Sequence, residues 1–312
     1  MKTHLRFWVF ALCIVAFSLV PIPAQVKIPQ VQNIQPKTPL AAPIIKNPNS
    51  LAVPEKTQAD TALRFILDFQ FNCWYAAAGE DAAEYSRLVI PSTWEGLPVR
   101  YLWREAFKGL DSLEEIVLPD TLYSIGSEAF KDCSNLVSIN IPASVTSIGS
   151  RAFQGCEQLT TIELPERCQV IPQQAFSGCS SLESIYFSPQ VRIIETAAFE
   201  GCESLLEIDL PEGITEISAS LFAGCSSLAN LTIPAAVKNI GSYAFMNCSS
   251  LESLALPEGM IRINKETFRG CSSLESLDLP SSLRHIEEGA FREIDGPLDL
   301  IIPNGVTSIG RE

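Results

Sequence analysis

The fold is decided by residues 133–155, which read CSNLVSINIPASVTSIGSRAFQG. The same pattern, C-x-x-L-x-x-I/L-x-I/L-P-x-x-V-x-x-I-x-x-x-A-F-x-G, returns every 23 residues over most of the chain. Phenylalanine fills one position of it nine times without a slip, at Phe107, Phe130, Phe153, Phe176, Phe199, Phe222, Phe245, Phe268 and Phe291. Chance does not produce such a period, so the chain is an array of one repeated unit.

Other positions of the unit recur with the same spacing of 23 residues. Isoleucine recurs at Ile125, Ile148, Ile171, Ile194, Ile217, Ile240, Ile263, Ile286 and Ile309, and leucine at Leu113, Leu136, Leu159, Leu182, Leu205, Leu228, Leu251 and Leu274. Cysteine recurs at Cys133, Cys156, Cys179, Cys202, Cys225, Cys248 and Cys271. Proline closes each L-x-x-I-x-I segment except in one unit, where Ser188 takes its place.

Each unit predicts two short strands and a turn. Leu136, Ile139 and Ile141 alternate with polar residues and end at a proline, which cannot donate to a strand ladder, so they predict a short strand. Val145–Ile148 is consistent with a second strand on the opposite wall. Ala152–Cys156 resembles a single helical or 3₁₀ turn. One such coil cannot bury its apolar side alone, but coils stacked at about 4.8 Å share a continuous core, which predicts a solenoid.

The unit resembles the leucine-rich repeats of bacterial surface antigens of the BspA type, and the resemblance covers residues 87–312. The segment Leu88–Val99 is similar to that family's first repeat, with five extra residues between its proline and its phenylalanine. The resemblance implies a β-rich (α/β class), right-handed leucine-rich-repeat solenoid with short parallel strands and short helical or 3₁₀ turns. It further implies a secreted or cell-surface protein of a bacterium, used for adhesion or host-protein binding, with no catalytic residue.

The segments before the repeats predict export and display. Residues 1–24 resemble a signal peptide, with Lys2 and Arg6 before an apolar stretch too short to span a bilayer comfortably; an uncleaved anchor is the alternative. Residues 25–57 are rich in proline and predict an extended linker or a disordered leader.

Residues 58–86 form the predicted N-terminal cap. The alternating Phe65, Leu67, Phe69 and Phe71 suit a capping strand over the open end of the core. Tryptophans occur at Trp74, Trp94 and Trp103, and they favour cap core over a sugar-stacking surface.

Composition excludes several function classes. Lys and Arg number 22 against 36 Asp and Glu, which gives a net charge of −14 and argues against nucleic acid or anionic lipid as a partner. The two histidines, His4 and His285, leave too few imidazoles for triads or His-rich metal sites. We therefore expect no metal and no cofactor. The 23-residue count is unbroken from Pro119 to Pro303 and leaves no room for an inserted catalytic domain.

The seven periodic cysteines favour a buried structural ladder over disulfides or a metal array. Their side chains point in parallel, and an odd number cannot all pair. A buried thiol acts as a small apolar group that donates weakly to backbone. Cys168 occupies a position filled elsewhere by valine and is also predicted core; for Cys73 a reactive thiol stays the alternative.

Function on a solenoid falls to outward residues. Those on the first strand of each unit are polar, and our candidate ligand contacts for a protein or glycan are Glu163, Tyr186, Glu207, Asp209, Thr232 and Asp278. A solvated sheet face is the alternative. The second strand carries a sparse basic row, which could orient a partner or arise by coincidence, at Arg192, Lys238, Arg262, Arg284 and His285.

The sequence thus predicts a binding module, with a structural spacer as the alternative. Near the end of the chain the pattern decays, with Ile294 at the cysteine position and Pro297 at the leucine position, and the chain stops at Glu312 inside a repeat. An uncapped last coil exposes strand edges. We expect either association through this end or a truncated member of the family.

Overall fold

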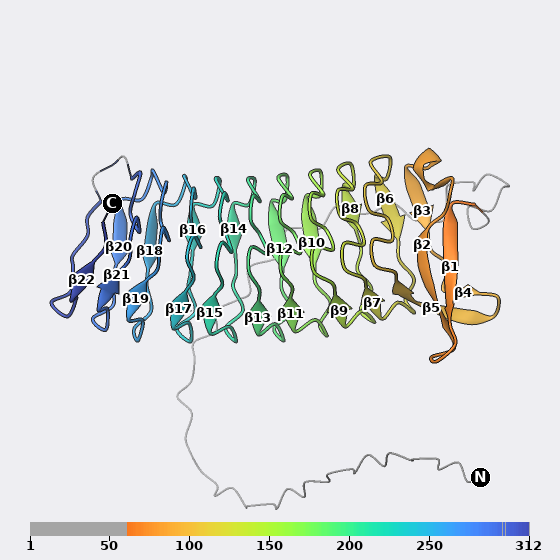
Figure 1. Ribbon diagram of the computed structural model, residues 1–312, viewed down its shortest axis with the longest axis horizontal. Helices are drawn as coiled ribbons and strands as arrows, with labels where there is room; N and C mark the ends of the chain where they lie inside the picture. Colours follow the sequence, from red (N-terminus) through yellow and green to blue (C-terminus); the bar gives the residue numbers. More distant parts are fainter. Residues whose placement is uncertain (1–60, 295, 297, 312) are drawn as a thin grey trace, which may run out of the picture. The chain divides into compact units, whose positions relative to one another are not determined.

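The computed structural model describes residues 61–294, 296 and 298–311, which form a β-solenoid of about ten coils (Figure 1). The predicted signal peptide and the predicted linker lie outside the described residues, so those predictions stay open. The predicted fold class is confirmed, with repeats of 23 residues that present short parallel strands.

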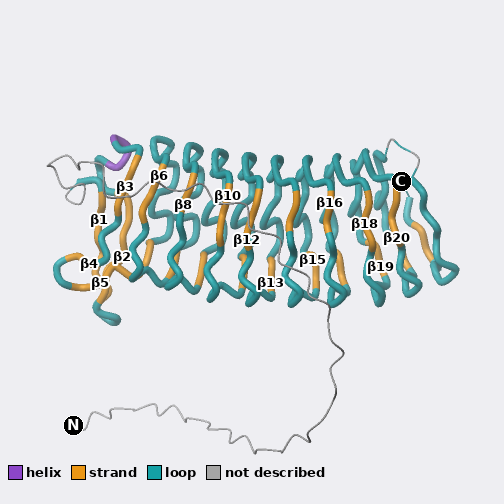
Figure 2. Tube along the Cα trace, turned by 180° about the vertical axis from the view of Figure 1, so that it is seen from behind, coloured by secondary structure: helices purple, strands orange, loops and turns teal. Residues whose placement is uncertain are grey.

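Each coil contributes one strand to each of two walls, seen from behind in Figure 2. The first wall contains β3 (Arg87–Val89), β6 (Glu115–Val117), β8 (Ser138–Ile139), β10 (Thr161–Glu163), β12 (Ser184–Tyr186), β14 (Glu207–Ile208), β16 (Asn230–Leu231), β18 (Ser253–Ala255) and β20 (Ser276–Asp278). The second wall contains β2 (Cys73–Ala78), β5 (Leu97–Leu102), β7 (Ser124–Ile125), β9 (Ser147–Ile148), β11 (Val170–Ile171), β13 (Ile193–Ile194), β15 (Glu216–Ile217), β17 (Asn239–Ile240), β19 (Arg262–Ile263), β21 (His285–Ile286) and β22 (Ser308–Ile309). The second short strand per unit is therefore confirmed.

The A-F-x-G segments are chains of tight turns. Their i to i−3 hydrogen bonds, such as Lys131 N to Glu128 O at 3.2 Å, match the 3₁₀ pattern that the sequence suggested. A left-handed residue two positions before the phenylalanine and another two positions after it, as in Glu128 and Asp132, interrupt each run before it becomes a helix. Among the described residues the 3₁₀ turn η1 (Ala82–Glu84) is the one helix assigned, and no helix there is long and apolar enough to cross a membrane.

The core is a column of stacked rings. Consecutive phenylalanines from Phe107 to Phe291 lie 5.3–6.0 Å apart between ring centroids, with interplanar angles of 0–19°. Beside the rings, the backbone N–H of each phenylalanine from Phe107 to Phe268 donates to a carbonyl of the next coil, as in Phe130 N to Ala152 O at 2.8 Å. Coil spacing is thus set by backbone bonds and ring contacts together.

The cysteine ladder is confirmed. All seven thiols are buried and free, and each Sγ donates to the carbonyl of a phenylalanine 26 residues earlier, at 3.0–3.3 Å. Burial raises the pKa of the Cys179 and Cys225 thiols to about 12. Cys168 is core as predicted, and Cys73 is buried with a pKa raised mainly by that burial, which favours the packed alternative.

The N-terminal cap is an antiparallel hairpin, β1 (Leu63–Asp68) with β2, which continues the second wall. The predicted capping strand ends earlier than expected. Asp68 Oδ1 accepts the backbone N–H groups of Gln70 and Phe71 at 2.9 and 3.1 Å, so the chain turns there. Phe69 and Phe71 are consequently exposed on this turn rather than packed on the core.

The five extra residues of the first repeat form a second hairpin, in which β4 (Thr93–Trp94) pairs antiparallel with β5. Trp94 stacks on Phe65 with 4.3 Å between centroids, and Trp74 Nε1 donates to the Trp94 carbonyl at 2.7 Å. These two tryptophans belong to the cap as predicted. Trp103 does not, since it is exposed on the outer face of the second wall.

At the other end, β22 pairs with β21, but Ile301 and Ile309 are largely exposed. Apolar side chains are therefore accessible in the last described coil. Association through this end stays a prediction.

Replacing Phe199 by Ala should lower the free energy of unfolding by about 3–5 kcal/mol, because the neighbouring rings are too closely packed to fill the cavity. Urea denaturation measures the change. The matched control is Phe69→Ala, whose ring is 87% exposed and whose removal should cost less than about 0.5 kcal/mol. Equal effects in both variants would contradict the ring column.

The thiol ladder predicts a loss of stability at alkaline pH. In the folded chain burial raises the pKa of the Cys179 thiol to about 12, whereas an unfolded thiol releases its proton near pH 8.5. The free energy of unfolding should therefore fall as pH rises from about 9 to 12, and fall less in Cys179→Ala.

The thiol ladder also predicts that the native protein resists alkylation at the seven thiols. Disulfides among these thiols in the native protein would refute the ladder.

Candidate binding surface

The outward residues of the first wall form one continuous surface, which we call the strip. The six predicted contact residues all lie on it and are all exposed. Glu163, Tyr186, Asp209 and Thr232 occupy the same repeat position in four successive coils, and Asp278 follows two coils further on. Glu163 and Tyr186 are directly paired between β10 and β12. Glu207 belongs to a second row of outward residues, two positions before that of Asp209, and is paired with Asn230 of the next coil.

Tyr186 projects from the middle of the strip. Its side chain is 62% exposed, while its neighbour Ile185 points into the core. Carboxylates at the same repeat position stand on the coils before and after it, Glu163 and Asp209. An exposed ring between two carboxylates offers an apolar contact area and two hydrogen-bond acceptors to one ligand.

Most acidic side chains of the strip have no cationic partner among the described residues. Nine exposed carboxylates on the first wall make no ion pair among the described residues, namely Glu114, Glu163, Glu183, Glu207, Asp209, Glu252, Glu275, Asp278 and Asp299. At the N-terminal end, Glu115 pairs with Arg87 at 2.9 Å. Some acids elsewhere are paired, as is the Glu128 carboxylate, whose pKa is lowered by a hydrogen bond from Lys108. Beyond Glu115, the first wall therefore presents exposed carboxylates that no base among the described residues neutralises.

The basic row of the second wall does not form a free surface. Arg192 Nη1 donates to the carbonyls of Pro189 and Val191 at 2.6 and 2.9 Å, and Arg284 Nη1 binds the equivalent carbonyls of Ser281 and Leu283. Lys238 Nζ likewise donates to Ala235 O at 3.0 Å. These three bases recur every 46 residues. Each one stabilises, in its own coil, the turn that follows the proline position.

The next coil accommodates these bases with glycine. A Cβ at Gly213 would lie 2.6 Å from Arg192 Nη1, and one at Gly305 would lie 2.3 Å from Arg284 Nη1. In the same wall Arg262 pairs with Glu287, and His285 Nδ1 is 2.8 Å from Ser308 Oγ. The basic side chains of the predicted row are therefore bonded to groups of this chain. Along this corner, coils with a base bound to the turn carbonyls alternate with coils that lack one.

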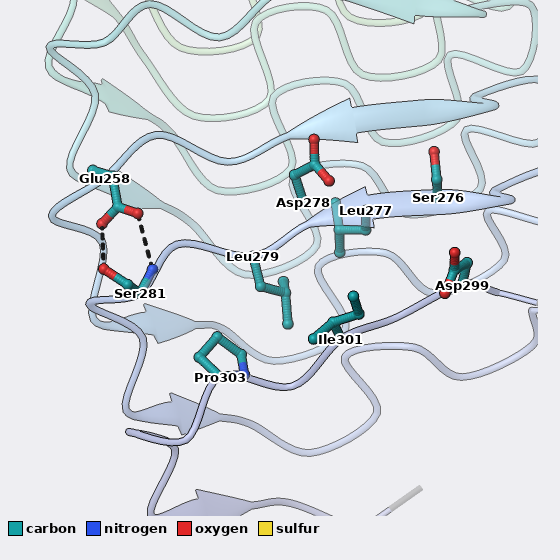
Figure 3. Close-up of a pocket in the computed structure, with 9 residues that line it drawn as sticks. All are labelled: Glu258, Ser276, Leu277, Asp278, Leu279, Ser281, Asp299, Ile301 and Pro303. Carbon is teal, nitrogen blue, oxygen red and sulfur yellow. Dashed lines mark hydrogen bonds between the residues drawn. The ribbon is translucent and has the colours of Figure 1, made fainter.

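A hollow of about 440 Å³ lies at the C-terminal end of the strip (Figure 3). Asp278 lines it together with Leu279, Ile301 and Pro303. On one side Glu258 accepts the backbone N–H and the hydroxyl of Ser281 at 3.0 and 3.1 Å, bonds that lower the pKa of its carboxyl. Of the six predicted contact residues, Asp278 is the one in this hollow.

One exposed cluster escaped the sequence analysis. On the outer face of the second wall Tyr75 stacks on Tyr101 at 4.8 Å, and Trp103 and Tyr123 meet this pair edge-on at 4.9 and 6.1 Å. Tyr101 is paired with Ser124 of the next coil. The signal was Tyr101, an aromatic residue at an outward position that is serine in the next two repeats, at Ser124 and Ser147.

The repeat geometry agrees with a family match. A model described as the BspA type leucine rich repeat region matches residues 101–229 and 215–312, which together exceed half of the chain. The chain belongs to this family. Its members form leucine-rich-repeat solenoids and are generally non-enzymatic.

Solved structures give a consistent fold. The pneumococcal vaccine antigen PcpA is 22% identical with a TM-score of 0.54, over 80% of this chain and 78% of that one. A T. pallidum leucine rich repeat protein is 25% identical with a TM-score of 0.42, over 78% and 90% of the two chains. A leucine rich cell surface protein from Faecalibacterium prausnitzii is 24% identical with a TM-score of 0.44, over 75% and 86%. Of these three, PcpA supports the fold. No curated protein matches this sequence.

Proposed function

We propose that this leucine-rich-repeat chain is a non-enzymatic binding protein, exported by residues 1–24 and displayed at a bacterial cell surface, whose strip binds a protein or glycan ligand. The observation that carries the proposal is the exposed Tyr186 within a surface of unpaired carboxylates. Similarity to a bacterial cell-surface protein and to a pneumococcal antigen supports the location. Tyrosine is enriched among residues that dominate binding energy.

The charge of the strip favours a ligand with basic groups. Carboxylates without partners attract and orient a cationic surface, and this attraction weakens as salt screens it. A glycan ligand would instead use the carboxylates as hydrogen-bond acceptors around the Tyr186 ring. Salt dependence of binding separates these two kinds of ligand.

A rigid spacer is the second candidate. The uninterrupted count from Phe107 to Phe291 favours it, because an unbroken stack of coils is stiff along its length without any ligand. In that case the strip carboxylates serve solubility. Ligand binding decides between the two functions.

Binding to arrays of host-surface proteins and glycans, followed by titration of each positive, tests the proposal. Tyr186→Ala should weaken binding by about tenfold or more, and Glu163→Gln with Asp209→Asn should weaken it and reduce its salt dependence. The controls are Tyr123→Ala, and Glu216→Gln with Asp120→Asn, which make the same changes off the strip. The absence of a saturable ligand would favour the spacer. Equal losses in the controls would show that the ligand does not bind at the strip.

A further inference from the structure

The strand β1 (Leu63–Asp68) ends the sheet of the second wall, since the strand order is β1-β2-β5-β7-β9. Its outer edge has no strand partner among the described residues. At six residues it equals β2 and β5 as the longest strands described, whereas the repeat strands have two or three residues. It contains neither proline nor lysine, the residues that commonly protect an edge from pairing.

The sequence of β1 is complementary to itself in antiparallel register. With Ile66 at the centre, Arg64 lies opposite Asp68 of a second copy, and Phe65 lies opposite Leu67 of that copy. Partners in such a pair point to the same face, so charge meets opposite charge on the outer face and apolar side chains meet on the core face. A shift of two residues would place Arg64 or Asp68 opposite Ile66, so the register is specified.

The side chains of β1 are available for this pairing. Arg64 is exposed and has no ion pair among the described residues, and Phe65, Ile66 and Leu67 are only half-buried. Tyr75 is the β2 partner of Ile66 and stacks on Tyr101. Pairing at Ile66 would therefore join the aromatic clusters of two copies into one apolar row across the contact.

We propose that β1 is a homodimer interface, in which two copies of this chain pair antiparallel about Ile66 and continue the second-wall sheet across a two-fold axis. Such a contact is closed, because the same strand serves both copies. It leaves both strips free, so dimerisation presents two binding surfaces together and is independent of the function proposed above.

Sedimentation of the full chain over a wide concentration range tests the proposal. We expect a reversible monomer–dimer equilibrium, and Arg64→Glu should raise its dissociation constant roughly tenfold, because each new glutamate faces Asp68 of the other copy. The matched control is Arg100→Glu, an exposed base on β5 away from the edge, which should leave the equilibrium unchanged.

Cross-linking tests the register. In a Cys13→Ser background, Ile66→Cys should form an intermolecular disulfide on mild oxidation, because facing Cα atoms lie within bridging distance. Arg64→Cys should not, because its counterpart lies four residues further along the second strand. The nine described native cysteines are buried and will not compete.

A monomer at every concentration would overturn the proposal. So would a dimer that Arg64→Glu leaves intact or that Ile66→Cys fails to cross-link, and either result would place the contact elsewhere, as at the last coil.

Discussion

Everything in this molecule depends on stacking one phenylalanine per coil. The ring column runs from Phe107 to Phe291 with centroid spacings of 5.3–6.0 Å, and each ring is locked beside a backbone bond to the next coil. An added residue has to loop out of the coil for the rings to stay stacked, as the five extra residues of the first repeat do in the β4–β5 hairpin. The thiol ladder follows from the same constraint, because each cysteine is placed where it can donate only to the carbonyl of a phenylalanine in the preceding coil.

A uniform interior leaves the outside free to vary. Nine carboxylates on the first wall have no cationic partner in the part of the chain that the structure describes. On the second wall, Arg192, Lys238 and Arg284 are bound to turn carbonyls. Ionic side chains are therefore used in two ways, as exposed carboxylates on the first wall and as bases that brace a corner on the second. A fold that resists change in its core and accepts change on its strip is suited to recognising ligands.

The sequence was sufficient wherever inward residues repeat. Phe, Ile, Leu and Cys at fixed spacing predicted the coils, both walls, the ladder and the exposure of all six strip residues. It was insufficient where one residue depends on a contact outside its own unit. Glu128 is left-handed because the stacked corner demands it, which no residue preference reveals, and Phe69 is exposed because Asp68 forms a local turn. The basic row looked free because the glycine that faces Arg192 belongs to the next coil.

Hydrogen exchange of the native protein tests directly whether the ring column and its backbone bonds hold the coils together. If the ring column and its backbone bonds hold the solenoid together, the amides of Phe130, Phe153, Phe176 and their equivalents should exchange slowest in the chain, because they open only when neighbouring coils separate. The amides of the turn at Phe69–Asn72 should exchange far faster. Exchange at the stacked phenylalanines as rapid as in that turn would contradict the account.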